Sequence, residues 1–265
     1  MHDATVYINA GGRGTRLNGV FQPDPRFGIA KALLRIGPNG KTAIECQVES
    51  ALATQPRNVV VAAGDQSEVV RHIEAAYGTL DNVTVLHSDQ CLGNGGDLIW
   101  SVRRHLELFA PELVVVNCDT LLTLRMQDLV TTHRSHPGVL TMGLTTLPGV
   151  PNEKAFWVNP DGLILYNGEL QRNAMTEAEA GVFTQYRASS SGALAVDTGF
   201  VADFDWDSQR GELSIYRDIV GQAVRSRRAY AYNNGRNLFL DIGTAATWAQ
   251  VAQDPSLVNT MLRYA

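Results

Sequence analysis

Apolar and polar positions form two kinds of segment in the first half of the chain. Short runs rich in β-branched residues have the pattern of buried strands. Between them, apolar residues recur every three or four positions, as Ile44, Val48 and Leu52 do, which is typical of amphipathic helices. Strand and helix in alternation predict a mostly parallel sheet with helices on both faces. The expected strands are residues 4–10, 58–63, 83–87 and 113–117, and the expected helices are residues 42–54, 67–77, 95–108 and 126–134.

The pattern changes from about Thr141 onward. Short apolar runs at 155–158 and 163–166 flank Asn159-Pro160-Asp161-Gly162, a turn sequence typical of a β-hairpin. The predicted fold class is therefore α/β: a Rossmann-like, mostly parallel sheet flanked by helices, with a mixed-sheet C-terminal half. A ligand crevice is expected at the carboxyl ends of the parallel strands. Later strands are expected at 193–196 and 238–241, and later helices at 212–224 and 244–252.

Composition narrows the classes of protein. Hydrophobic residues make up 45% of the 265 positions and charged residues 18%, which is ordinary globular composition. The net charge of −5 gives no general attraction to nucleic acid or anionic membrane, so any phosphate must be bound by a local site. The start of the chain has no signal-type segment, and no apolar stretch is long enough for a membrane span. We expect a cytoplasmic protein in which Cys46, Cys91 and Cys118 are small buried residues without a metal or a disulfide.

The segment Gly11-Gly12-Arg13-Gly14-Thr15-Arg16-Leu17 directly follows the first expected strand. Closely spaced glycines let the backbone turn tightly and present successive amides to an anion, and an arginine adds a bidentate phosphate donor. A tight turn without ligand is the alternative. Leu17 stands where the dinucleotide fingerprint needs its third glycine, and no Gly-Lys-Ser/Thr closes a Walker A loop. The loop therefore favours phosphate binding of another type.

This segment resembles the GGxGTRL signature of the sugar-1-phosphate nucleotidyltransferases, also called nucleotide-sugar pyrophosphorylases. Further segments are similar to motifs of that family in the same order, across nearly the whole chain. They are Gly28-Ile29-Ala30-Lys31-Ala32-Leu33-Leu34, Leu92-Gly93-Asn94-Gly95-Gly96-Asp97-Leu98, Asn117-Cys118-Asp119, Thr198-Gly199-Phe200 and Phe239-Leu240-Asp241-Ile242-Gly243-Thr244.

The resemblance implies one nucleotidyltransferase domain over residues 1–265, with a nucleotide-binding half at 1–140 and a sugar-binding half at 141–265. It implies that a nucleoside triphosphate and a sugar 1-phosphate are the partners, that Mg²⁺ is the cofactor, and that an NDP-sugar and pyrophosphate are the products. A homo-oligomer is compatible with it. The implied residues are, for catalysis, Arg16, Lys31 and Asp119; for the nucleotide, Ala10, Gly11, Gly12, Gly14, Thr15, Gly95 and Gly96; for the sugar, Asn117, Thr198 and Gly199; and for the metal, Asp119 and Asp241.

The chain departs from the family pattern in places. Ala30 precedes the lysine where many relatives have proline, and no Glu-Lys-Pro segment follows the hairpin, so Glu169, Arg172 and Lys154 are the candidates to hold the sugar phosphate. The Leu-Gly-Asn-Gly-Gly loop and the short chain resemble the heptose 1-phosphate guanylyltransferase branch, which favours GTP, with uridine and cytidine nucleotides as the open alternatives. Asp89 and Asp97 are expected to be capping or surface residues.

Two other functions remain open. The first is a non-catalytic relative that binds a nucleotide sugar and regulates a partner, although the retained lysine, arginine and carboxylates favour catalysis. The second is a glycosyltransferase with a D-x-D metal motif, for which Asp205-Trp206-Asp207 is the matching spacing.

Overall fold

The computed structural model describes most of the chain. Three of the expected site residues, Gly14, Thr15 and Arg16, lie outside the described residues, as do Cys91 and Arg172. The described residues are 1–12, 30–36, 40–90, 92–146, 154–170, 173–207, 211–235, 239–242, 245–254, 256 and 258.

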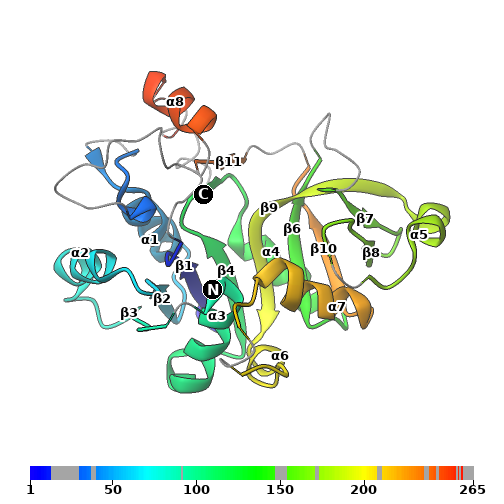
Figure 1. Ribbon diagram of the computed structural model, residues 1–265, viewed down its shortest axis with the longest axis horizontal. Helices are drawn as coiled ribbons and strands as arrows, with labels where there is room; N and C mark the ends of the chain where they lie inside the picture. The colour runs from blue at the N-terminus through cyan, green and yellow to red at the C-terminus, as the bar shows by residue number, and fades with distance from the viewer. Residues whose placement is uncertain are drawn as a thin grey trace.

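The first half forms the predicted parallel sheet (Figure 1). Strand β1 (Ala4–Asn9) lies between β2 (Asn58–Ala62) and β4 (Glu112–Asn117), and β3 (Val83–Leu86) pairs with the far side of β2. All three pairings are parallel, so the carboxyl ends of the four strands share one edge. The helices that connect these strands and lead onward are α1 (Ala43–Ala53), α2 (Ser67–Tyr77), α3 (Gly93–Arg104) and α4 (Met126–Ser135).

The second half continues the same sheet with mixed pairing. Strand β9 (Tyr186–Asp197) pairs antiparallel with both β4 and β6 (Leu140–Thr145), and β10 (Ala229–Asn233) pairs parallel with β6. The hairpin β7 (Phe156–Val158) and β8 (Ile164–Tyr166) attaches to the first part of β9. One long strand therefore joins the parallel half to the mixed half, and the predicted fold class is confirmed.

A small two-stranded sheet stands beside the main sheet. Strand β5 (Thr120–Leu122) directly follows the end of β4 and pairs antiparallel with β11 (Phe239–Asp241). The remaining helices are α5 (Glu177–Phe183), α6 (Thr198–Ala202), the π-helix η7 (Ile215–Val220), α7 (Gly221–Arg225), α8 (Ala245–Gln253) and two single 3₁₀ turns, η2 (Lys31–Leu33) and η4 (Leu106–Leu108).

Side chains of the central strand alternate between two cores. Val6 and Ile8 pack with α1, α2 and α4 on one face, whereas Tyr7 packs with α3 and the η7–α7 segment on the other. All three side chains are fully buried. This burial on both faces explains why the strand is a continuous apolar run without polar alternation.

Local signals fix several element ends. Thr42 and Glu45 form a capping box at the start of α1, satisfying helix N–H groups that have no partner within the helix. In the hairpin turn, Asn159 Oδ1 accepts hydrogen bonds from the N–H groups of Asp161 and Leu163, and Gly162 has φ +81°. The predicted hairpin is confirmed. The helix expected at 212–224 begins later, at Ile215, and its first turn is a π-helix.

Candidate active site

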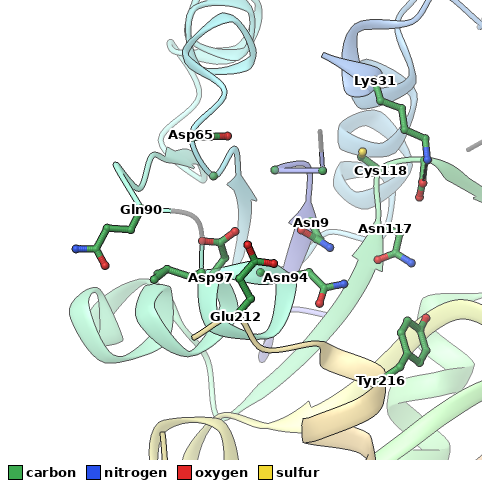
Figure 2. A pocket seen from close by; sticks show the side chains of 16 residues that line it. Asn9, Lys31, Asp65, Gln90, Asn94, Asp97, Asn117, Cys118, Glu212 and Tyr216 are labelled. Atoms are coloured by element: carbon green, nitrogen blue, oxygen red, sulfur yellow. Dashed lines mark hydrogen bonds and ion pairs between the residues drawn. The ribbon is translucent and has the colours of Figure 1, made fainter. Parts of the chain in front are cut away.

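A cavity of about 570 Å³ opens at the carboxyl ends of the parallel strands, where the alternation of strand and helix predicted a crevice. Figure 2 shows Lys31 at one end of it, Asp65, Asp97 and Glu212 at the other, and Asn9 between them. Polar groups from several separate elements therefore converge on one space. Its lining residues are Asn9, Gly11, Gly12, Lys31, Gly64, Asp65, Gln90, Leu92, Gly93, Asn94, Asp97, Asn117, Cys118, Asp119, Glu212 and Tyr216.

The described start of the glycine loop lies in the cavity wall. Gly11 passes so close to Gly64 that a Cβ on Gly11 would lie 3.0 Å from the Gly64 Cα, whereas a Cβ on Gly12 would meet nothing within 4 Å. Gly11 therefore allows two loops to approach, and Gly12 leaves open space facing the cavity. Ala10 is different: its side chain is buried in the core beneath the loop, and its N–H donates to the carbonyl of Ala62.

Lys31 and Asp119 are brought together by the fold. Lys31 begins the η2 turn, Asp119 follows the end of β4, and the ammonium forms an ion pair with Asp119 Oδ2. The Lys31 side chain is only 7% exposed and that of Asp119 17%. A lysine held this deep in a cavity wall presents its charge to the space in front of it, which is what binding of an anionic substrate requires.

The pairing of β5 with β11 brings the two predicted metal carboxylates near each other. Asp241 at the end of β11 is opposite Thr120, the neighbour of Asp119, and the N–H of Ile242 donates to the Asp119 carbonyl. Both carboxylates are close enough to Tyr216 to act on its hydroxyl. Burial, with a contribution from these two carboxylates, raises the pKa of the Tyr216 phenol.

A second cavity of about 350 Å³ adjoins the first, sharing Asn117 and Tyr216 with it. The Tyr216 hydroxyl accepts a hydrogen bond from Ser190 and hydrogen-bonds to Asn117 at this junction. A π-helix carries Tyr216, and short π segments occur frequently at functional sites. The second cavity is lined by Asn117, Thr120, Lys154, Phe156, Asn167, Glu169, Leu170, Ser190, Gly192, Tyr216 and Asp241.

Two of the three candidates for holding a sugar phosphate, Lys154 and Glu169, line this second cavity. Asn167 fixes the loop between them. It is buried, its Nδ2 donates to the Lys154 carbonyl, and its Oδ1 accepts from the Glu169 N–H. A carboxylate, Glu169, and an ammonium, Lys154, therefore lie at one end of the hairpin although the chain has no Glu-Lys-Pro segment there.

Gly95 and Gly96 have a packing role in the structure, and their part in nucleotide binding stays a prediction. A Cβ on Gly95 would lie 2.8 Å from the backbone carbon of Ser214, and one on Gly96 would lie 3.0 Å from the Trp206 ring. These glycines let α3 pack tightly against the chain that precedes η7. The α3 residues that face the cavity are Gly93, Asn94 and Asp97.

The structure places Thr198 and Gly199, the other predicted sugar residues, away from the residues that line the two cavities. They begin α6, where the Thr198 N–H donates to the Pro111 carbonyl and its hydroxyl donates to Ala110. These partners precede β4, so Thr198 and Gly199 lie at the edge of the sheet opposite the two cavities. Asn117, the third predicted sugar residue, lines both cavities.

Asp97 is neither a capping nor a surface residue, contrary to expectation. It is 8% exposed, lines the larger cavity and accepts a hydrogen bond of 3.1 Å from the Ser88 hydroxyl. Burial raises the pKa of its carboxyl to about 6, against the lowering effect of Ser88 and with additions from Asp65 and Glu212. Asp89 is exposed, as expected.

The D-x-D spacing lies outside the two cavities. Asp205 and Asp207 are exposed, while Trp206 between them is buried against Gly96, and its carbonyl accepts from the Arg103 guanidinium. This tripeptide therefore anchors the segment after α6 to α3. Of the cysteines, Cys46 and Cys118 are free, and both are buried, as predicted.

Several lining residues were not predicted. Asn9 is the last residue of β1, as Asn117 is of β4, so its place at the carboxyl end of a buried strand could have indicated it. Ser190 and Gly192 lie within β9. Gly192 has φ +85°, and a Cβ there would lie 2.8 Å from the Thr120 side chain, so both the backbone and the close approach favour glycine. Tyr216 and Glu212 carry no local signal, since their place depends on the return of the chain to α3.

Comparison with solved structures connects this geometry to known proteins. No protein-family model matches the chain, and no curated protein matches it. HddC from Yersinia pseudotuberculosis superposes with a TM-score of 0.67 at 17% identity, covering 94% of this chain and 98% of that one. This chain and HddC share one fold. The fold that the motif resemblance implied is thereby confirmed.

Two further structures share that fold. The inositol-1-phosphate CTP transferase from T. maritima gives a TM-score of 0.70 at 13% identity, covering 98% of this chain and 97% of that one. A putative glucose-1-phosphate thymidylyltransferase from Bacillus anthracis, in complex with a sucrose, gives 0.68 at 17% identity, covering 96% and 95%. No helix in the described ranges has both the length and the apolar character that a membrane span requires.

Proposed function

We propose that this protein is a sugar-1-phosphate nucleotidyltransferase that condenses a nucleoside triphosphate with a sugar 1-phosphate and releases pyrophosphate. One observation carries the proposal: two cavities meet at Asn117 and Tyr216, beside the Lys31–Asp119 ion pair. A reaction between two phosphorylated substrates needs two adjoining sites with cationic and carboxylate groups at their junction. The names of the structures that share the fold agree with this reaction.

The larger cavity is the nucleotide site in this proposal. The Gly11–Gly12 backbone lies in its wall, and the phosphates would bind towards Lys31 at one end (Figure 2). Gly14, Thr15 and Arg16 would extend this phosphate site by the family resemblance. We infer GTP as the nucleotide from the Leu-Gly-Asn-Gly-Gly loop, and the HddC structure complexed with GMP-PN, with a TM-score of 0.69, supports that choice.

The smaller cavity is the sugar-phosphate site. Phe156 supplies an apolar wall, Ser190 a hydroxyl, and Glu169 a carboxylate able to accept hydrogen bonds from sugar hydroxyls. Lys154 supplies the positive charge that a phosphate monoester requires. The position of Lys154 at the start of the hairpin therefore makes it our candidate for holding the sugar phosphate.

The residues at the junction fit a divalent cation. Asp119, just before β5, and Asp241, at the end of β11, offer hard carboxylate oxygens. This donor set suits Mg²⁺ completed by phosphate oxygens and water. The described residues contain no group of three or more His, Cys, Asp or Glu side chains able to hold a metal alone, which suits an ion that binds together with its substrate. When bound, the ion would neutralise charge that develops on the phosphate oxygens.

The reaction follows from these positions. An oxygen of the sugar phosphate attacks the α-phosphorus, a new P–O bond forms, and the bond from the α-phosphorus to the bridging oxygen breaks as pyrophosphate leaves. Lys31, between the two sites, stabilises charge on the α-phosphate and on the incoming phosphate; Arg16 would do so for the leaving pyrophosphate. Catalysis of this kind needs no side-chain nucleophile, because positioning and electrostatics supply the rate.

The direct test is release of pyrophosphate from a matrix of nucleoside triphosphates and sugar 1-phosphates, with Mg²⁺ and with a chelator. Release that needs one triphosphate, one sugar phosphate and the metal together supports the proposal and names both substrates. A folded protein that binds nucleotide sugars but stays silent across the panel would indicate the regulatory binder. Transfer of sugar to an acceptor without pyrophosphate would indicate a glycosyltransferase.

A further inference from the structure

The end of the larger cavity away from Lys31 is acidic. Asp65, Asp97 and Glu212 come from three different segments and meet there, as Figure 2 shows. Carboxylates repel a triphosphate, so they orient a bound nucleotide with its phosphates towards Lys31 and its base towards the acidic end (Figure 2). The base therefore faces carboxyl groups.

Asp97 differs from its two acidic neighbours in burial. Asp65 and Glu212 are exposed, whereas Asp97 is 8% exposed and sits in the first turns of α3. Its Oδ1 is held by the Ser88 hydroxyl, the described residue that donates a hydrogen bond to this carboxyl. The second oxygen, Oδ2, lies beside Gly64, where a Cβ would come within 3.4 Å of it. Because Gly64 has no side chain, no side chain from that position covers Oδ2.

The chemistry of a carboxylate selects among bases. An ionised carboxylate only accepts hydrogen bonds, through two oxygens side by side. Guanine has two adjacent donors on its Watson–Crick edge, the N1–H and the 2-amino group. Adenine and cytosine place an acceptor next to their amino group, and uracil and thymine flank their single N–H with two carbonyls. Each of the other four bases therefore puts a lone pair against the carboxylate.

We propose that Asp97 selects the nucleobase, accepting hydrogen bonds from the N1–H and the 2-amino group of guanine through its two carboxylate oxygens. This inference rests on the proposed nucleotide site and assigns base specificity within it to one residue. Ser88 is the positioning residue, because its hydroxyl fixes the orientation of the carboxyl. Asp65 and Glu212 set the polarity of the site without contacting the base edge.

A substitution that reverses one hydrogen bond tests this directly. Asp97→Asn keeps an acceptor for N1–H but presents an amide donor where guanine has its amino group. Xanthine carries a carbonyl at that position, so the variant should bind XTP in place of GTP. Equilibrium binding of GTP, ITP, XTP, ATP, CTP and UTP is measured by calorimetry for the wild type, Asp97→Asn and Glu212→Gln, the last losing a nearby exposed charge.

We expect the wild type to bind GTP at least about tenfold more tightly than ITP, which lacks the amino group, and than XTP. Asp97→Asn should reverse the order of GTP and XTP, and Glu212→Gln should keep the wild-type order. If wild type prefers one base and Asp97→Asn keeps that preference, the assignment to Asp97 is overturned while the nucleotide site stands. If no triphosphate binds to folded wild type, both the assignment and the proposed function are overturned.

Discussion

Lys31 and Asp119 form an ion pair at the wall of the larger cavity, although 88 residues separate them in the sequence. The two side chains come from the η2 turn and from the end of β4, so the pair ties the chain that follows the glycine loop to the centre of the sheet. The same pair places a positive and a negative charge beside the junction of the two cavities. It therefore connects folding to the proposed chemistry.

Removing the Lys31 charge should lower both the stability of the fold and the rate of the proposed reaction. Lys31→Met leaves the Asp119 carboxylate without its partner, and we expect a loss of up to about 3 kcal/mol in the free energy of unfolding. The rate of pyrophosphate release should fall about 100-fold or more, since a charge that stabilises the transition state is lost. Urea denaturation and steady-state kinetics measure the two effects.

A double substitution separates the two roles. Lys31→Met combined with Asp119→Asn removes both charges, so most of the lost stability should return while activity stays low. Full activity in Lys31→Met would contradict the catalytic role of the lysine, whatever its effect on stability.

Some glycines of the site are packed tightly against other segments, and others face open space. Substitution by alanine should distinguish the two kinds. Gly95→Ala drives a Cβ into the Ser214 backbone at 2.8 Å, and we expect it to cost about 1–3 kcal/mol of stability. Gly12→Ala meets nothing within 4 Å, so stability should change by less than about 0.5 kcal/mol. Its KM for the triphosphate should rise, because the methyl group occupies space facing the cavity.

Gly199→Ala is the matched control for this pair. It also meets nothing within 4 Å, but it lies at the opposite edge of the sheet. We expect unchanged KM values for both substrates. A rise in the KM for the sugar phosphate in this variant would restore the sugar role first inferred from the sequence.

Asp97 should make stability depend on pH in a predictable direction. Burial raises its pKa from 3.8 to about 6, so between these values the folded state binds more protons than the unfolded state and stability falls as pH rises. Asp97→Asn cannot ionise. It should match wild type near pH 4 and exceed it above pH 6 by up to about 3 kcal/mol. Thermal melts from pH 4 to about pH 8 measure this, and a wild type as stable as the variant at the upper end would contradict it.

If Asp119 and Asp241 both bind Mg²⁺, loss of either carboxylate should weaken the binding of the metal. Asp241→Asn should raise the concentration of Mg²⁺ needed for half-maximal pyrophosphate release by about tenfold or more, because one of two anionic ligands is lost. Glu169→Gln provides the comparison, since it removes a carboxylate from the same cavity but from a different wall. The proposal fails if both variants respond to Mg²⁺ as wild type does.

The parallel half was predictable because its signals are local. Buried strands are continuous apolar runs, and Gly11, Asn117 and Asp119 could be placed near the cavity because each follows or ends such a run. The sugar side was less predictable. Strand β9 was expected at 193–196 but begins at Tyr186, so its cavity-side residues are Ser190 and Gly192 rather than Thr198.

Two further features of the site have a tertiary cause. Gly95 and Gly96 follow the expected pattern, but what requires a glycine there is a segment more than a hundred residues later that packs against α3. From its position near the start of a predicted helix, Asp97 was expected to be a capping or surface residue. The approach of Ser88 and Gly64, which lie outside that helix, makes it a buried group facing a cavity. Contacts between distant segments are not encoded in the local pattern.

Strand β9 has a consequence for how this protein could be divided or recombined. It fills the place between β4 and β6, so the apolar run of β4 is an interior strand only while the C-terminal half is attached. A fragment ending near residue 140 would present Leu113 to Val116 as an open sheet edge, which is a template for aggregation. Exchanging the C-terminal half as a cassette would therefore require a donor that brings its own equivalent of β9 in the same register.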